Sequence, residues 1–108
     1  MASSEKINQL QLLQQNLQNL ASQKQQFQSQ LMELGSALTE LNSTEKSYRI
    51  VGKIMIAVPR EKLEQELKEK KEMLDLRIKN FDQQEEKIQK VIDDLQKDIF
   101  SELKKEKK

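Results

Sequence analysis

The chain contains no cysteine and no histidine, and each absence removes a class of chemistry. Without cysteine it forms no disulfide, has no thiolate nucleophile and cannot bind zinc through sulfur. Without histidine it lacks the commonest general base and the commonest imidazole ligand for metals. No glycine-rich phosphate-binding loop of the Walker type occurs either. We therefore predict that the chain is not an enzyme and has no catalytic, cofactor-binding or metal-binding residues.

Glycine, proline and aromatic residues are scarce: the chain has two glycines, one proline and 4% aromatic residues. Only 35% of its 108 residues are hydrophobic, which is too little for a large globular core. Charged residues make up 34%, a share typical of long helices or coiled coils when glutamine and leucine are also abundant. Disordered chains share this low hydrophobicity, but the leucines here are spaced more regularly than disorder would require, which favours helices. The composition predicts one domain of mainly α fold.

Strong net charge and long hydrophobic runs are also absent. The formal net charge is +1, which argues against a general attraction to nucleic acid or to an anionic membrane. No apolar run approaches the ~20 residues that a membrane-spanning helix requires. The first residues, MASSEK, lack the apolar core of a signal peptide. We expect a cytoplasmic protein with neither nucleic acid nor membrane as a partner.

The N-terminal part of the chain carries the apolar spacing of a coiled coil. Lys24 is the one polar residue in this seam, and Gly35 beside the seam should weaken the helix by about 1 kcal/mol. If the Lys24 ammonium is held between the helices, Lys24→Leu is predicted to raise the melting temperature. No gain would mean that the site is open or paired with an acid. The seam is Leu10, Leu13, Leu17, Leu20, Lys24, Phe27, Leu31, Leu34, Leu38 and Leu41.

A second helix is predicted to begin at Pro59, whose fixed φ suits the first turn. Its main apolar stripe is interrupted at Lys71 and Glu85 and accompanied by a flanking row of isoleucines. Two helices of matched length joined by a short insert most naturally form an antiparallel coiled coil, with the termini together at one end. The stripe is Leu67, Leu74, Phe81, Ile88 and Leu95, and the flanking row is Ile78, Ile92 and Ile99.

Residues 48–58, YRIVGKIMIAV, form the only stretch typical of β-strand. Gly52-Lys53 is a Gly-X pair suited to a two-residue type II′ turn, which predicts a β-hairpin. The chain therefore divides into an N-terminal helix in 1–47, a hairpin in 48–58 and a C-terminal helix in 59–108. The turn pairs Val51 with Ile54, Ile50 with Met55, Arg49 with Ile56, and Tyr48 with Ala57.

The predicted hairpin places Val51, Ile54 and Ile56 on one face, and neither face is polar. An isolated hairpin is marginal in water, and its edges are templates for further strands. Folding onto its own coiled coil is the alternative, but this would bury one face and leave the edges open. We predict that other copies or other subunits complete the sheet. The predicted assembly residues are Tyr48, Ile50, Val51, Gly52, Ile54, Met55, Ile56 and Val58.

The stretch from Tyr48 to Leu67, YRIVGKIMIAVPREKLEQEL, lies between helices of equal length and resembles the beta-class subunits of prefoldin, a hexameric co-chaperone. The resemblance covers nearly the whole chain, with Gly35 and Pro59 as local variations. It implies that the hairpins assemble into inter-subunit β-barrels that hold the coiled coils. It also implies an ATP-independent holdase that captures non-native proteins and delivers them to a group II chaperonin, with alpha-class subunits and copies of itself as partners.

Apolar residues at the open ends of the two predicted helices are candidates for binding non-native proteins. Leu12 and Phe100 lie off the seams and are expected to face outward, whereas the others could simply close the end of the coil. The candidates are Ile7, Leu10, Leu12, Leu13, Ile99, Phe100 and Leu103.

Two other functions fit parts of the sequence. A helical hairpin that binds nucleic acid would use Lys104, Lys105, Lys107 and Lys108, although the balanced charge argues against it. A structural tether would use the hairpin only as a linker. The lysines themselves are interpreted as a solvated terminus or as a guide to an acidic chaperonin surface.

Overall fold

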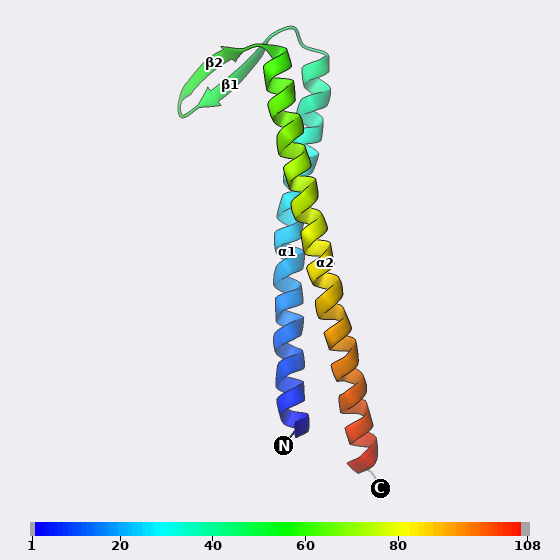
Figure 1. Ribbon diagram of the computed structural model, residues 1–108. Coiled ribbons are helices and arrows are strands. Elements are labelled where there is room, and N and C mark those ends of the chain that lie inside the picture. Colours follow the sequence, from blue (N-terminus) through cyan, green and yellow to red (C-terminus); the bar gives the residue numbers. More distant parts are fainter. Residues whose placement is uncertain (1, 107–108) are drawn as a thin grey trace. The chain divides into compact units, whose positions relative to one another are not determined.

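The computed structural model describes residues 2–106 of the chain and the side chains of residues 4–105. Its elements are α1 (Ala2–Asn42), β1 (Ser47–Val51), β2 (Ile54–Val58) and α2 (Arg60–Glu106), in that order (Figure 1). This confirms the mainly α fold with one hairpin between two long helices. No helix within these residues is long and apolar enough to cross a membrane.

The described residues divide into two compact units. The first unit comprises residues from Met1–Gln25 and Lys79–Lys108, and the second comprises Gln26–Ile78, which includes the hairpin. In the first unit, Lys6 pairs with Glu102 and Lys24 with Asp82, so the two helix segments run antiparallel. In the second unit, the Arg77 guanidinium lies 5.5 Å from the centre of the Phe27 ring, so α1 and α2 are in contact there too.

The predicted seams lie at the interface between the helices. Every seam residue from Leu10 to Leu41 is at least half-buried, and Leu41 is only 6% exposed. In α2 the stripe residues are half-buried, and Ile92 is the most buried residue at 3% exposure. Ile92 is therefore a seam residue and not a flanking one. The two isoleucines beside it in the predicted row, Ile78 and Ile99, are also half-buried, so stripe and row form one alternating seam.

Hydroxyl groups end α1. Ser43 Oγ and Thr44 Oγ1 donate to the Glu40 carbonyl at 2.9 and 2.8 Å. The backbone N–H of Ser43 reaches the same carbonyl at 3.1 Å. These bonds satisfy a carbonyl that has no partner further along the helix, so the chain turns away after Asn42.

Pro59 stands immediately before α2 and not inside its first turn. Its carbonyl accepts the first helical hydrogen bond, from the Leu63 N–H at 3.2 Å, as an N-cap residue does. Glu61 then lies in the first turn, and Lys104 and Lys105 lie in the last. The charges at both ends therefore interact favourably with the helix dipole.

The hairpin has the predicted register. Val51 pairs with Ile54, Tyr48 pairs with Ala57, and the ladder continues one residue further, to Ser47 and Val58. Gly52 has a φ of 62°, and among residues 2–106 no residue other than glycine has a positive φ. A positive φ at the first turn position alone fits type II′ and excludes type I′. The Ser47 hydroxyl donates to the Val58 carbonyl at 2.6 Å and closes the base of the hairpin.

Candidate functional site

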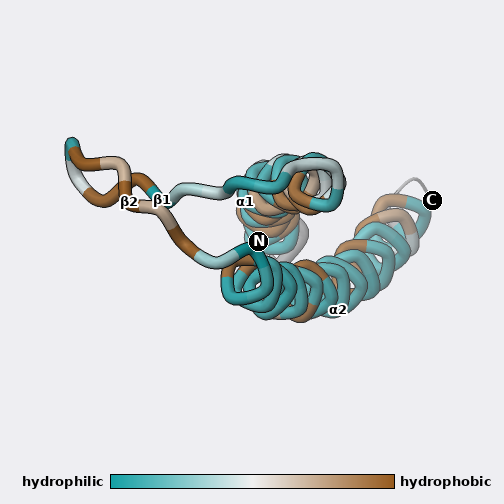
Figure 2. Tube along the Cα trace, turned by 90° about the horizontal axis from the view of Figure 1, so that it is seen from above, coloured by the Kyte–Doolittle hydropathy of each residue, from teal (hydrophilic) through white to brown (hydrophobic). Residues whose placement is uncertain are grey.

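The hairpin exposes apolar side chains on both faces. Tyr48, Ile50, Met55 and Ala57 share one face, and Ile50 is 70% exposed and Met55 64% exposed. The hydropathy colouring in Figure 2 shows the two strands as mostly hydrophobic, whereas the helices are largely hydrophilic. Side chains of this kind are normally covered, so the hairpin is the first candidate for a binding surface.

The second face of the hairpin is less uniform than predicted. Val51, Ile54 and Ile56 lie on it and are exposed, and Val58 at the base is half-buried. Arg49 lies on this face because it is the cross-strand partner of Ile56. Arg49 is therefore a charged side chain on a mostly apolar face. The Arg49 guanidinium forms an ion pair with Glu66 of α2.

Both outer edges of the hairpin are open. Within residues 2–106 the sheet has two strands, β1 and β2, and no third strand pairs with either. Backbone N–H and C=O groups along the outer edges therefore have no ladder partner within these residues and are available to a further strand. Open edges together with apolar faces are the features that β-augmentation uses.

The candidate residues near the helix termini all belong to the first unit. Leu12 and Phe100 are 60% and 63% exposed, as expected for positions off the seams. Ile7 and Leu103 are also exposed. By contrast, Leu10, Leu13 and Ile99 are half-buried in the helix interface. We call the four exposed residues the terminal surface: Ile7, Leu12, Phe100 and Leu103.

Charged groups lie beside the terminal surface. Lys6 Nζ is 2.6 Å from Glu102 Oε1, and the hydrogen bond to this carboxylate raises the pKa of Lys6 above its ordinary value. Lys104 Nζ lies 5.3 Å from the centre of the Phe100 ring, within the range of a cation–π interaction. Phe100 nevertheless keeps most of its surface exposed.

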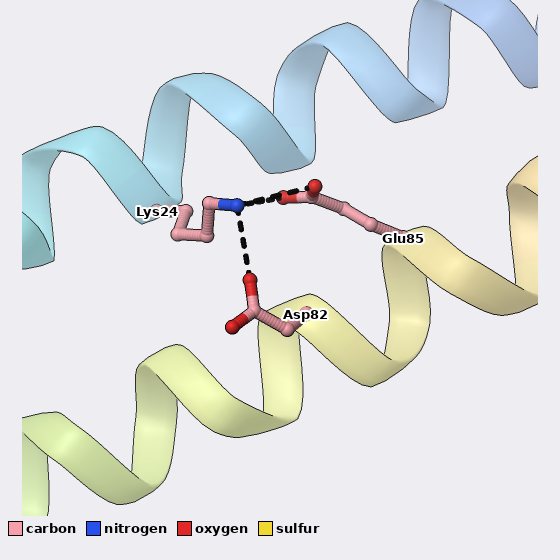
Figure 3. Close-up of polar contacts among 3 residues, drawn as sticks. All are labelled: Lys24, Asp82 and Glu85. Atoms are coloured by element: carbon pink, nitrogen blue, oxygen red, sulfur yellow. Dashed lines mark hydrogen bonds and ion pairs between the residues drawn. The ribbon is translucent and has the colours of Figure 1, made fainter.

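The polar break in the seam is a three-residue cluster (Figure 3). Lys24 Nζ lies 3.0 Å from Asp82 Oδ1 and 3.2 Å from Glu85 Oε1. Hydrogen bonds to Asp82 and Glu85 raise the pKa of Lys24. Lys24 and Glu85 are both about four-fifths buried. The Lys24 break in the α1 seam and the Glu85 break in the α2 stripe thus belong to one ion-paired cluster. The other break in the α2 stripe, Lys71, is exposed and lies outside the cluster.

Comparison with known proteins identifies the family. Residues 4–106 match the family described as "Prefoldin subunit". The chain belongs to the prefoldin family. The prefoldin beta subunit of Pyrococcus furiosus is 37% identical over 101 residues, covering 91% of this chain and 86% of that protein. The counterpart in Methanothrix thermoacetophila is 38% identical over 98 residues, covering 88% of this chain and 82% of that protein.

The crystal structure of the prefoldin beta subunit from Thermococcus strain KS-1 has the same fold. It superposes with a TM-score of 0.91 at 33% identity, covering 94% of this chain and 92% of that one. The resemblance to beta-class prefoldin subunits drawn from residues 48–67 is therefore confirmed. The chain is a prefoldin subunit with a chaperone role.

The C-terminal lysines and the acidic side chains were the other groups considered as possible sites. Lys104 and Lys105 lie on the last turn of α2, whereas Lys107 and Lys108 are outside the described residues. In the described part of the chain no cluster of acidic side chains could hold a metal ion.

Three exposed apolar residues of the second unit escaped the sequence analysis: Met32, Met73 and Leu76. Their only signal in the sequence is an apolar side chain away from the seam.

Proposed function

We propose that this chain is the beta-class subunit of a prefoldin hexamer and that its hairpin is the assembly element. Its partners are other copies of itself and alpha-class subunits, joined through inter-subunit β-barrels. The observation that carries the proposal is the hairpin, whose faces are mostly apolar and exposed while its two edges pair with no further strand in the described residues. The assembled complex would act in the cytoplasm as an ATP-independent holdase that passes non-native proteins to a group II chaperonin.

The terminal surface is suited to binding non-native proteins, which are called clients below. Its four side chains are apolar and exposed, and capture by apolar contact needs no catalytic group. A single patch of this size binds weakly, but several patches carried by one complex raise the effective concentration of binding sites. A non-native chain that leaves one patch is then retained by another. ATP is not required because release needs only the dissociation of weak contacts.

Assembly is tested by placing carboxylates on the hairpin. Ile54→Asp together with Ile56→Asp is expected to disperse the complex with an alpha-class partner, because burying an unpaired carboxylate in a sheet costs several kcal/mol. The helical circular dichroism should persist, since both side chains are exposed in the single chain. Native mass spectrometry measures the assembly.

Lys53→Asp, at the exposed second position of the turn, is the matched control and should leave the complex intact. An unchanged mass for the Ile54→Asp/Ile56→Asp variant would reject the hairpin as the assembly element. The structural-tether interpretation would then be favoured.

A further inference from the structure

The direction in which the hairpin leaves the helices is weakly constrained by packing. Its apolar side chains are mostly exposed, and only Ser47, Arg49 and Val58 near its base are half-buried. The chain enters through the short segment 43–46 and leaves through Pro59. Chain connections of this length allow a range of hairpin angles.

One side-chain interaction joins the hairpin to a helix. The side chains of residues 4–105 form several hydrogen bonds and ion pairs. Of these, only the Arg49–Glu66 interaction connects residues 47–58 to α1 or α2. The Ser47 bond to Val58 stays within the hairpin. Glu66 lies near the start of α2, so this contact adds a third point of attachment beside the two chain connections.

We propose that the Arg49–Glu66 ion pair sets the direction of the hairpin and so makes it competent to pair with strands of neighbouring subunits. This inference rests on the proposed assembly function and names two residues that position the assembly element. Strand addition requires edges aligned along their whole length, so a hairpin pointing elsewhere cannot pair without first being reoriented.

An exposed ion pair shifts an equilibrium only about two- to fivefold, and Arg49 and Glu66 are each 38% exposed. In the complex, however, each copy of this chain carries the pair. The small orientational effects of the copies therefore multiply. Assembly should respond to the loss of the pair far more strongly than the stability of the single chain does.

The experiment is a charge exchange. Arg49→Glu and Glu66→Arg each place like charges together and are expected to raise the concentration of half-assembly with an alpha-class partner by about tenfold or more. The double variant Arg49→Glu/Glu66→Arg restores an opposite-charge pair and should recover most of the assembly. A role of Arg49 in packing alone would not be rescued by this exchange.

The matched control is the Glu64–Lys68 ion pair, which joins two residues of α2 at 3.1 Å. Lys68→Glu should leave assembly unchanged. If the single variants assemble as well as the wild type, or if the double variant is no better than the singles, the inference is wrong. The Ile54→Asp/Ile56→Asp variant separates this failure from that of the proposed function. Dispersal of that variant alone would leave the hairpin as the assembly element but not the ion pair.

Discussion

Lys24 shows how a charged residue can be accommodated in an otherwise apolar seam when acids of the other helix pair with it. Its ammonium is bound by Asp82 and Glu85, and the Glu85 carboxylate is itself largely buried. The sequence predicts no gain from Lys24→Leu if the site is open or if Lys24 is paired with an acid. The structure shows the second case, because Lys24 is paired with acids of α2. A leucine at this position would leave Glu85 without its counter-charge.

We expect Lys24→Leu to lower stability by about 1 kcal/mol, the lower part of the range for an unpaired buried group because the site keeps some exposure to water. Thermal unfolding should show a melting temperature roughly 4 to 8 °C lower. Lys24→Leu with Glu85→Leu makes the seam apolar throughout and should recover or exceed wild-type stability. A stabilised single variant would contradict the role of the cluster.

The same cluster predicts a pH dependence. Because its partners raise the pKa of Lys24 above 10.5, the stabilisation is fully present below that pH and is lost as pH rises through the raised value. Stability of the wild type should therefore fall more steeply above about pH 10.5 than that of the Lys24→Leu/Glu85→Leu variant. Parallel curves in thermal unfolding would exclude a contribution from Lys24.

Gly35 is a second residue whose environment decides the effect of a substitution. It lies within α1, and apart from the backbone of its own helix a Cβ at this position would meet no atom within 4 Å. Gly35→Ala should therefore stabilise the chain by about 1 kcal/mol, because alanine restricts the unfolded backbone more and has the higher helix propensity. A higher melting temperature is the expected observation, and an unchanged one would point to a packing role for the glycine.

At the scale of the elements, the hairpin requires the glycine at its turn, so replacing Gly52 should have the opposite effect to replacing Gly35. Gly52 also has open space around it, but its positive φ of 62° is disfavoured for any residue with a Cβ. Gly52→Ala should destabilise the turn by about 1 to 2 kcal/mol. Amide hydrogen exchange in β1 and β2 should accelerate while exchange in the helices stays unchanged. Unaltered exchange at Val51 and Ile54 would show that the turn tolerates the substitution.

Local pattern predicted most of the elements. The leucine spacing identified the α1 seam, and the Gly52-Lys53 pair fixed the hairpin register, because both depend on residues close in the sequence. The pairings of Arg49 with Glu66 and of Lys24 with Glu85 were not predictable in this way. Long charged side chains have many candidate partners on a charged helix, and the axial alignment of the helices selects among them. The exposed terminal surface was anticipated at Leu12 and Phe100 because off-seam positions face away from the partner helix.

For the whole molecule, client capture is the function to test. Replacing the terminal surface by glutamine, at Ile7, Leu12, Phe100 and Leu103, removes exposed apolar area and keeps the half-buried seam residues. We expect the assembled complex to keep its mass and to lose most of its ability to suppress aggregation of an unfolded test protein. The multivalent argument predicts a steep loss because every patch in the complex is weakened together.

The control for this test replaces exposed apolar residues of the second unit, Met32→Gln and Leu76→Gln. This variant should protect the test protein as well as the wild type does. Equal protection by the terminal-surface variant would show that clients bind elsewhere. Loss of protection in both variants would mean that the exposed apolar surface acts without regard to position.

The division of the chain into one unit of continuous sequence and one of two separate segments has a consequence for biosynthesis. Residues 26–78 can pair with one another as soon as they leave the ribosome, whereas Lys6 must wait for Glu102, 96 residues later. Pairing within the continuous unit also shortens the loop that the remaining segments have to close. During this delay the N-terminal segment lacks its partner helix, so Leu10 and Leu13 remain as accessible as Leu12. A nascent copy of this chain therefore passes through a stage at which it exposes the kind of apolar surface that we propose the assembled complex captures in other proteins.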